Sequence, residues 1–292
     1  MSLIQEIEAM RSGSAKSDAA RDAGLTTPDN IERFDDIGYC GDDKWHLLDV
    51  YSVKGSGIQP VLINVHGGGF VYGDKEVYQF YCMSMAQRGF KVVNFNYRLA
   101  PDSVYPSALE DMCAAVEWVC KNSETYGFDL NNVFMMGDSA GAVLLSQYAL
   151  MYSNSDYAKL FEYSAPKYRL GGLLLNCGFY FIEDDFVPEG VTKAYFGENP
   201  MADPQLANHF RMHDYIDSSY PPSYIMTSEA DFLRECAKPM YELLCSRCAH
   251  AVMKEYSAPD KTLGHVFHVD QRCEYAALCN DEEAAFLKAN II

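Results

Sequence analysis

The sequence lacks any apolar run close to the roughly 20 residues that a membrane-spanning helix needs. Its first ten residues are acidic and contain no basic region followed by an apolar stretch, so we do not expect a secretory signal. Positive charge is scarce, because 23 Lys and Arg face 41 Asp and Glu, a formal net charge of −18. Such a surface repels phosphates, which disfavours nucleic acid as a partner. We therefore expect a cytoplasmic protein that binds neither membranes nor nucleic acid.

Sequence motifs that hold nucleotide phosphates are missing too. No Gly-Lys-Ser/Thr follows a glycine-rich turn, and no G-x-G-x-x-G is present. Most of the ten cysteines lie inside apolar segments, which is typical of reduced, buried thiols. The single C-x-x-C, Cys245 and Cys248, has no second pair that would complete a zinc site. We expect neither a metal nor an organic cofactor.

What is present suits a globular chain of 292 residues, 49% hydrophobic and 22% charged, without a linker or composition break. Short apolar runs bounded by turn residues alternate with segments of helical periodicity. This alternation predicts a mostly parallel sheet covered by helices on both faces. The expected strands are 31–39, 45–53, 61–65, 91–96, 133–136, 171–177, 224–227 and 251–256. The expected helices are one or two short ones within 1–24, then 75–88, one opened by Pro106, 142–151, 235–249 and 281–289.

The most informative stretch is Gly137-Asp-Ser-Ala-Gly141, which lies between the strand at 133–136 and the helix at 142–151. A G-x-S-x-G between a strand and a helix is typical of a nucleophilic serine on a sharp turn. The flanking glycines leave room for a strained backbone at Ser139. The same pentapeptide also fits an ordinary loop, so the interpretation depends on the rest of the chain.

A serine hydroxyl needs a base to take its proton, and the base needs an acid to orient it. In sheets of this kind the partners follow the serine in the order Asp or Glu, then His. His265 follows the last strand, at the carboxyl edge that also carries Ser139, and is preferred over His268, whose alternative role is a hydrogen-bonded structural residue. Asp231 follows the preceding strand and is the preferred acid, with Glu229 as the alternative.

A third feature, His66-Gly-Gly-Gly69, follows the strand at 61–65. A loop without Cβ atoms lets backbone N–H groups approach a ligand closely. Together with the N–H of Ala140, these groups could converge on a carbonyl oxygen as an oxyanion hole. A glycine run can also hold phosphate, but the spacing of a phosphate loop is absent.

With these three parts, the chain resembles α/β-hydrolases of the hormone-sensitive-lipase-like esterase branch over roughly residues 45–290. Four stretches carry the resemblance: His66-Gly-Gly-Gly-Phe-Val-Tyr-Gly-Asp74, Asn96-Tyr-Arg-Leu-Ala-Pro-Asp102 with Pro106-Ser-Ala-Leu-Glu-Asp111, Gly137-Asp-Ser-Ala-Gly141 and Gly264-His-Val-Phe267. The resemblance implies an α/β-hydrolase fold with a central, mostly parallel eight-stranded sheet flanked by helices. It implies one domain over 1–292, with a small cap from 1–30 and a lid-like insertion at 179–217.

The resemblance also implies roles for individual residues. Ser139 would be the nucleophile, with Asp231 and His265 as its partners. The backbone N–H groups of the oxyanion hole would be those of Gly68, Gly69 and Ala140. Residues expected to support the site without touching substrate are His66, Gly67, Asp138, Arg98 and Asp111.

Among these supporting residues we expect Arg98 to pair with Asp138 or Asp111 behind the serine turn. The alternative is a solvated surface pair that contributes little to stability. The chain also departs from the family pattern. Ala142 replaces a glycine, Asn96 replaces an aspartate and Val266 replaces the glycine after the histidine. The N-terminal cap is short.

The expected function is hydrolysis of short-acyl carboxylic esters through a Ser-His-Asp triad and an acyl-enzyme. An acetyl group on a small alcohol or a carbohydrate is a natural substrate. No metal or cofactor is required, because backbone dipoles supply the charge stabilisation. Two alternatives stay open: an amidase or formamidase with the same triad, and a non-catalytic binding protein on the same fold. A small-molecule ester is the expected partner, and a homodimer remains open.

Overall fold

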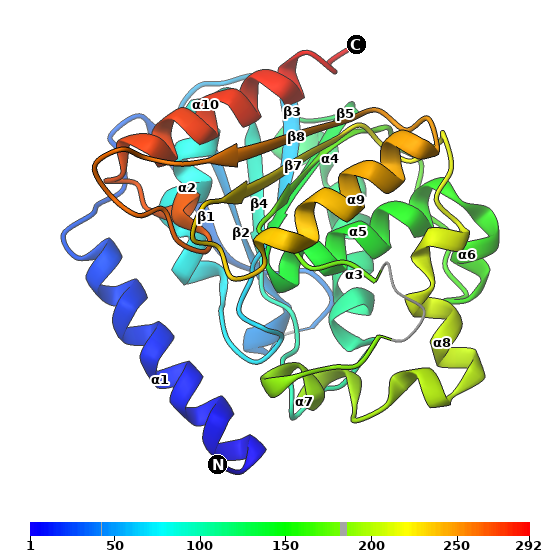
Figure 1. The fold of residues 1–292 in the computed structure, drawn as a ribbon. Helices are drawn as coiled ribbons and strands as arrows, with labels where there is room; N and C mark the ends of the chain where they lie inside the picture. Colours follow the sequence, from blue (N-terminus) through cyan, green and yellow to red (C-terminus); the bar gives the residue numbers. More distant parts are fainter. Residues whose placement is uncertain (42, 182–185) are drawn as a thin grey trace.

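The computed structural model describes residues 1–41, 43–181 and 186–292. Its strands form one eight-stranded sheet in the order β1-β2-β4-β3-β5-β6-β7-β8 (Figure 1). The β1–β2 and β2–β4 pairs are antiparallel, and every other neighbouring pair is parallel. The predicted eight-stranded, mostly parallel sheet is therefore confirmed. The strands are β1 (Ile31–Gly38), β2 (Leu47–Val53), β3 (Gln59–Val65), β4 (Lys91–Phe95), β5 (Phe128–Asp138), β6 (Leu170–Asn176), β7 (Ser223–Ser228) and β8 (Ala251–Tyr256).

Helices cover both faces of the sheet. Along β3, Val61 and Ile63 face a core shared with α3, α5 and α9, whereas Leu62 faces a second core shared with α2 and α10. Burial on both faces explains why this strand is mostly apolar, and its buried polar residue Asn64 donates to the Asn94 side chain at 2.9 Å. The α-helices are α1 (Leu3–Asp22), α2 (Lys75–Gln87), α3 (Ser107–Lys121), α4 (Ser123–Tyr126), α5 (Ala140–Ser153), α6 (Ser155–Lys159), α7 (Lys193–Phe196), α8 (Pro204–Phe210), α9 (Arg234–Ser246) and α10 (Glu274–Lys288). The short 3-10 turns are η1 (Lys44–His46), η2 (Gly190–Thr192), η3 (Pro200–Ala202), η4 (Met212–Asp214) and η5 (Phe267–Val269).

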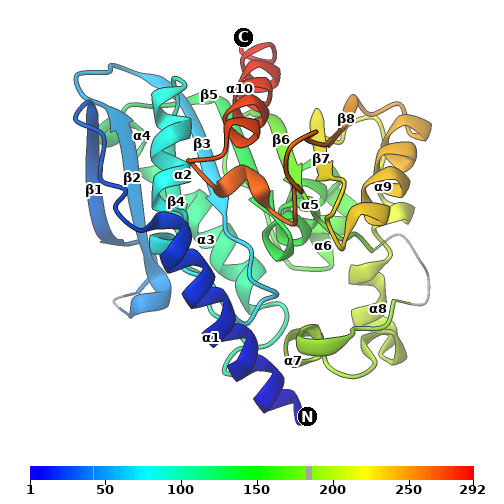
Figure 2. The same ribbon diagram turned by 60° about the vertical axis from the view of Figure 1, so that its left-hand side comes forward.

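Helix α1 is a single helix of 20 residues that begins with a capping box at Ser2. It runs beside the body of the protein, from near α7 at its N-terminal end towards α2 (Figure 2). Ile7 is its only buried residue. Leu3 and Met10 pack on the core while partly exposed. Polar contacts add to this, since Arg11 donates to the carbonyls of Val71 and Ala100, and Arg272 donates to carbonyls at the end of α1. None of the described helices is long and apolar enough to span a bilayer.

The segment predicted as a lid-like insertion, 179–217, is built in its described part from η2, α7, η3, α8 and η4. Positions 182–185 of this prediction lie outside the described residues. The aromatic rings of the segment pack mainly on one another and on the core. Tyr195 stacks on Phe70 at 4.6 Å between ring centroids, and Phe210 is fully buried. Packing therefore accounts for most of the aromatic residues in this segment.

Candidate active site

Ser139 lies between the end of β5 and the start of α5, with φ 51° and ψ −117°. This is a rare conformation for a residue with a side chain, and such strain is typical of functional positions. A Cβ on Gly137 would lie 2.8 Å from the carbonyl carbon of Gly141, as the sequence predicts for a tight turn. A Cβ on Gly141 would lie 2.0 Å from the carbonyl oxygen of Val65. The second glycine is therefore required by the close approach of α5 to β3, and not by the turn alone.

His265 and Asp231 are brought together as predicted. Nδ1 of His265 lies 2.6 Å from Oδ1 of Asp231, whose side chain is fully buried while that of His265 is 20% exposed. The carboxylate also accepts from the Thr227 hydroxyl at 2.8 Å and from the Leu233 N–H at 2.9 Å. Burial alone would raise the pKa of Asp231, but these hydrogen bonds, led by that from His265, hold it below its ordinary value. A charged acid therefore orients the imidazole.

The alternative residues are placed elsewhere. His268 is completely buried, with its ring edge-on to Tyr81 at 5.2 Å between centroids. Burial lowers the pKa of His268 to about 3, and its ring nitrogens have no hydrogen-bond partner in the part of the chain that the structure describes. It is a structural residue, as the alternative interpretation has it, and its backbone carbonyl accepts from the Asn280 side chain at 3.1 Å. Glu229 accepts a long hydrogen bond of 3.4 Å from the Leu263 N–H and does not orient His265.

A cavity of about 640 Å³ opens over the serine turn. Its wall includes Ser139 and His265 together with the glycine loop. The N–H groups of Gly68 and Gly69 have no acceptor among the described residues, so they are available to a ligand. Other elements close the cavity. The lining residues they contribute are Met10, Ser14, Ser17, Asp18 and Arg21 of α1, Tyr72, Val77, Phe179, 189–192, Phe232, Leu233 and Val266.

The glycine loop is held from behind by two aromatic residues. His66 is buried and stacks on Tyr97 at 4.0 Å between ring centroids, and its Nδ1 lies 2.7 Å from the Gly67 carbonyl oxygen. Burial lowers the pKa of His66 to about 4, so the ring is neutral and donates from Nδ1. The Tyr97 hydroxyl donates to the His66 carbonyl at 2.8 Å. These contacts agree with the supporting role predicted for His66.

Tyr78, on α2, connects the glycine loop to the serine turn. Its hydroxyl accepts from the Gly67 N–H at 3.0 Å and donates to Oδ2 of Asp138 at 2.7 Å. Burial raises the pKa of Asp138 to about 6, against the opposing effects of the Tyr78 hydrogen bond and of attraction to His265. Sequence analysis missed Tyr78, because nothing in its spacing marks it among the other tyrosines of the chain.

Arg98 pairs with Asp111, one of the two predicted carboxylates. Its guanidinium lies 2.7 Å from Oδ1 of Asp111, and a second pair with Glu110 spans 2.9 Å. Asp138 bonds to Tyr78 instead. Of the two expected partners, Arg98 therefore pairs with Asp111 and not with Asp138, and its side chain is held at the start of α3. There it also donates to the Ser107 carbonyl.

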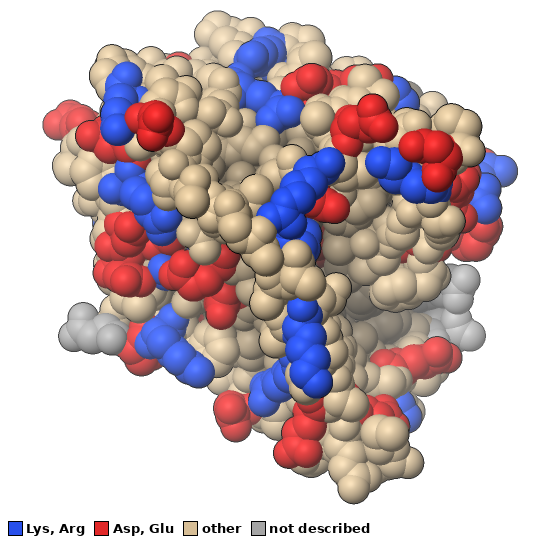
Figure 3. All heavy atoms as spheres, turned by 90° about the vertical axis from the view of Figure 1, so that its left-hand side faces the viewer, with Lys and Arg blue, Asp and Glu red and all other residues tan. Residues whose placement is uncertain are grey.

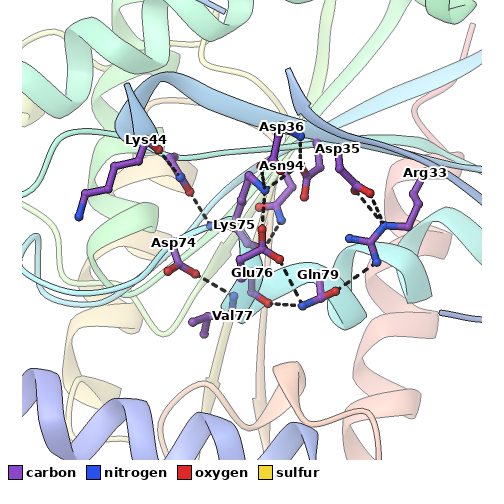
Figure 4. Close-up of polar contacts among 12 residues, drawn as sticks. Arg33, Asp35, Asp36, Lys44, Asp74, Lys75, Glu76, Val77, Gln79 and Asn94 are labelled. Carbon is purple, nitrogen blue, oxygen red and sulfur yellow. Dashed lines mark hydrogen bonds and ion pairs between the residues drawn. The ribbon is translucent and has the colours of Figure 1, made fainter. Parts of the chain in front are cut away.

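An ionic cluster around the buried Lys75 side chain fixes the start of α2, shortly after the glycine loop. Figure 4 shows Lys75 pointing towards Asp36 and Glu76, and its Nζ lies 2.8 Å from Asp36 and 2.9 Å from Asp49. Burial alone would lower the pKa of Lys75, but hydrogen bonds to these carboxylates raise it above its ordinary value. Asn96 accepts from the Lys75 N–H at 2.6 Å, which gives a structural use to a residue that departs from the family pattern.

Cys177, Asp231 and His265 each offer one potential metal ligand, and these atoms lie within 4.8 Å of one another. Asp231 and His265 already bond directly to each other, and the same carboxylate accepts from Thr227 and Leu233. The three side chains therefore suit the orientation of an imidazole better than a metal centre. Cys245 and Cys248 are both free and exposed.

The charge around the site is mixed, despite the net charge of −18. Figure 3 shows the face that carries α1, where basic and acidic side chains are interspersed and basic ones run down the middle. Within the cavity wall, Arg21 lies beside Asp18 with 3.0 Å between the paired atoms, and Glu189 belongs to the same wall. Both signs of charge therefore line the cavity.

Comparison with known proteins agrees with this geometry. Residues 62–269 match a family described as having the alpha/beta hydrolase fold. Versiconal hemiacetal acetate esterase of Dothistroma septosporum is 27% identical over 237 residues, 73% of this chain and 66% of the relative. Lipase 2 of a Moraxella species is 28% identical over 64% of this chain and 50% of the relative. The matches thus span half to two thirds of the length of these relatives.

A similar solved structure is that of esterase B from Lactobacillus rhamnosis, inhibited by a tributyrin phosphonate. It superimposes with a TM-score of 0.88 over 98% of this chain and 94% of that chain, at 24% identity. The relatives support the enzyme class predicted from the sequence, a carboxylesterase-type serine hydrolase. The chain belongs to the alpha/beta hydrolase fold family.

Proposed function

We propose that this protein hydrolyses carboxylic esters with short acyl groups, with Ser139 as the nucleophile. The observation that carries the proposal is the 2.6 Å bond between His265 and a buried Asp231, at the wall of the cavity that also contains Ser139. A histidine oriented by a charged acid can take the serine proton and later return it to a leaving group.

In this mechanism the Ser139 hydroxyl attacks the ester carbonyl while His265 accepts its proton. The negative charge on the carbonyl oxygen is stabilised by the N–H groups of Gly68, Gly69 and Ala140. Such donors each contribute about 3–4 kcal/mol to the transition state in serine hydrolases. His265 then protonates the leaving alcohol, and a water molecule, activated by the same base, hydrolyses the acyl-enzyme.

The preference for short acyl groups is supported by the cavity and by the relatives. A cavity of about 640 Å³ is of the size that holds a small ligand. One relative is named an acetate esterase, and the solved esterase B was inhibited by a tributyrin phosphonate with four-carbon chains. An acetyl ester of a small alcohol or a carbohydrate is therefore our proposed substrate class.

A series of p-nitrophenyl esters from acetyl to long acyl, beside acetylated oligosaccharides, tests the proposal, with Ser139→Ala as the blank. We expect kcat/KM to peak at acyl chains of two to four carbons and activity to vanish in the blank. A peak at long chains would contradict the acyl preference. Matched esters and amides separate this function from the amidase alternative, which requires comparable rates on both.

A further inference from the structure

Val266, the residue after His265, has a backbone conformation that its side chain disfavours. Its φ is 53° and its ψ 31°, in the left-handed region that glycine adopts without steric cost. A β-branched residue there is an outlier. The Val266 carbonyl accepts from the Val269 N–H at 3.1 Å, and the partly buried residue packs against the core that contains Cys177. Strain of this kind persists where the surroundings determine the conformation.

The Val266 side chain forms part of the cavity wall next to His265. On the other flank lies Phe232, which is 76% exposed and whose ring centroid is 4.2 Å from that of His265. Val266 and Phe232 are therefore apolar residues of the same cavity wall as His265, and the Phe232 ring lies against the imidazole. A glycine at position 266 would relax the backbone but would remove an apolar side chain from the cavity wall next to His265.

The position of His265 tells which part of the ester lies beside Val266 and Phe232. The imidazole that protonates the leaving oxygen must lie within hydrogen-bond reach of it. The carbon group attached to that oxygen consequently lies beside the residues that flank His265. We propose that Val266 is a specificity-determining residue that restricts the alcohol portion of the ester to small, unbranched groups. This inference rests on the proposed esterase function.

The test compares variants on esters that differ in one part only. Val266→Gly and Val266→Ala remove all or most of the side chain at this position. Val266→Thr keeps its branched shape and serves as the matched control. Ethyl acetate and cyclohexyl acetate differ in the alcohol, and ethyl acetate and ethyl hexanoate differ in the acyl group. Far-UV circular dichroism confirms that each variant is folded.

We expect the ratio of kcat/KM for cyclohexyl acetate over ethyl acetate to rise about 10-fold or more in the Gly and Ala variants, the scale that a misfit of one or two methylene groups produces. The Thr variant should keep the wild-type ratio. The ratio of kcat/KM for ethyl hexanoate over ethyl acetate should be the same in the wild-type protein and in all three variants. A change in the acyl ratio with a constant alcohol ratio would overturn the inference.

Thermal unfolding provides a readout that does not depend on activity. Loss of a partly buried side chain alone would make Val266→Gly less stable than Val266→Ala. Because the backbone conformation favours glycine, we expect the unfolding midpoint of the Gly variant to be at least as high as that of the Ala variant. An unfolding midpoint of the Gly variant below that of the Ala variant would refute backbone strain at position 266.

Failure of the inference differs from failure of the proposed function. If the wild-type protein hydrolyses ethyl acetate but all variants keep its alcohol ratio, the esterase function stands and the role of Val266 is wrong. If the wild-type protein hydrolyses none of the esters, the proposed function fails and the inference fails with it.

Discussion

Asp138→Asn tests the electrostatics of the serine turn. Burial raises the pKa of Asp138 to about 6, from an ordinary value of 3.8. Between these pH values the folded protein keeps a proton that the unfolded chain releases, so the contribution of Asp138 to stability falls as the pH rises from about 4 to about 6. At about 1.4 kcal/mol per pKa unit, the ionised carboxylate costs the folded state up to about 3 kcal/mol at pH 8.

Asparagine keeps the shape of the side chain and an acceptor for the Tyr78 hydroxyl, but it never ionises. The free energy of unfolding of Asp138→Asn should therefore rise relative to wild type by up to about 3 kcal/mol between pH 4 and pH 8. Urea unfolding of both proteins at pH 4.5, 5.5, 7 and 8 measures this difference, in which the contributions of groups that do not interact with Asp138 cancel.

The same substitution should lower activity. Attraction to His265 lowers the pKa of Asp138, so the ionised carboxylate also stabilises the imidazolium that forms during catalysis. We expect kcat at pH 8 to fall although stability rises. A difference in unfolding free energy that stays constant from pH 4.5 to pH 8 would refute the assignment of Asp138 as a buried, titrating carboxylate.

The remaining predictions concern the supports of the site. Tyr78→Phe removes the donor to Asp138 and the acceptor of a loop N–H, so at pH 8 urea unfolding should show a loss of about 2–4 kcal/mol, with a lower kcat on every ester. Stability equal to that of the wild-type protein would contradict the role of Tyr78 in connecting the glycine loop to Asp138. Arg98→Ala should cost about 2–3 kcal/mol in the same assay, because Asp111 is buried; no loss would mean that the pair is only a surface contact. Gly141→Ala should fail to fold, since its Cβ would lie 2.0 Å from a backbone oxygen, and a soluble, active variant would contradict the packing of α5.

Much of the fold was predictable because the hydrophobic pattern of each segment matches the burial of that segment in the sheet or in the helices that cover it. The run at 61–65 is apolar except for Asn64 because β3 is buried on both faces, and the strand-to-helix context of Ser139 follows from the same alternation. Chain order then placed Asp231 and His265 at one edge of the sheet. Helix α10 was predicted to begin at 281 but begins at Glu274, because Leu278 is exposed and Asn280 is buried, which obscures the helical periodicity of its first turns.

The supports of the site were less predictable, since they depend on contacts between segments far apart in the sequence. Tyr78 reaches Asp138 across 60 residues, and Lys75 reaches Asp49 from a different element. Charge alone left Asp138 and Asp111 as alternative partners of Arg98, and the structure pairs Arg98 with Asp111 while Asp138 bonds to Tyr78. Only the three-dimensional arrangement tells which of several plausible charge pairs forms.

The central claim is that Ser139 is the nucleophile, and covalent labelling tests it most directly. The protein is treated with a fluorophosphonate, digested and examined by mass spectrometry, with Ser139→Ala as the control. We predict a single adduct on the peptide that contains Ser139, loss of ester hydrolysis in proportion to labelling, and neither labelling nor hydrolysis in the variant. Labelling of another residue, or hydrolysis that persists in Ser139→Ala, would contradict the account.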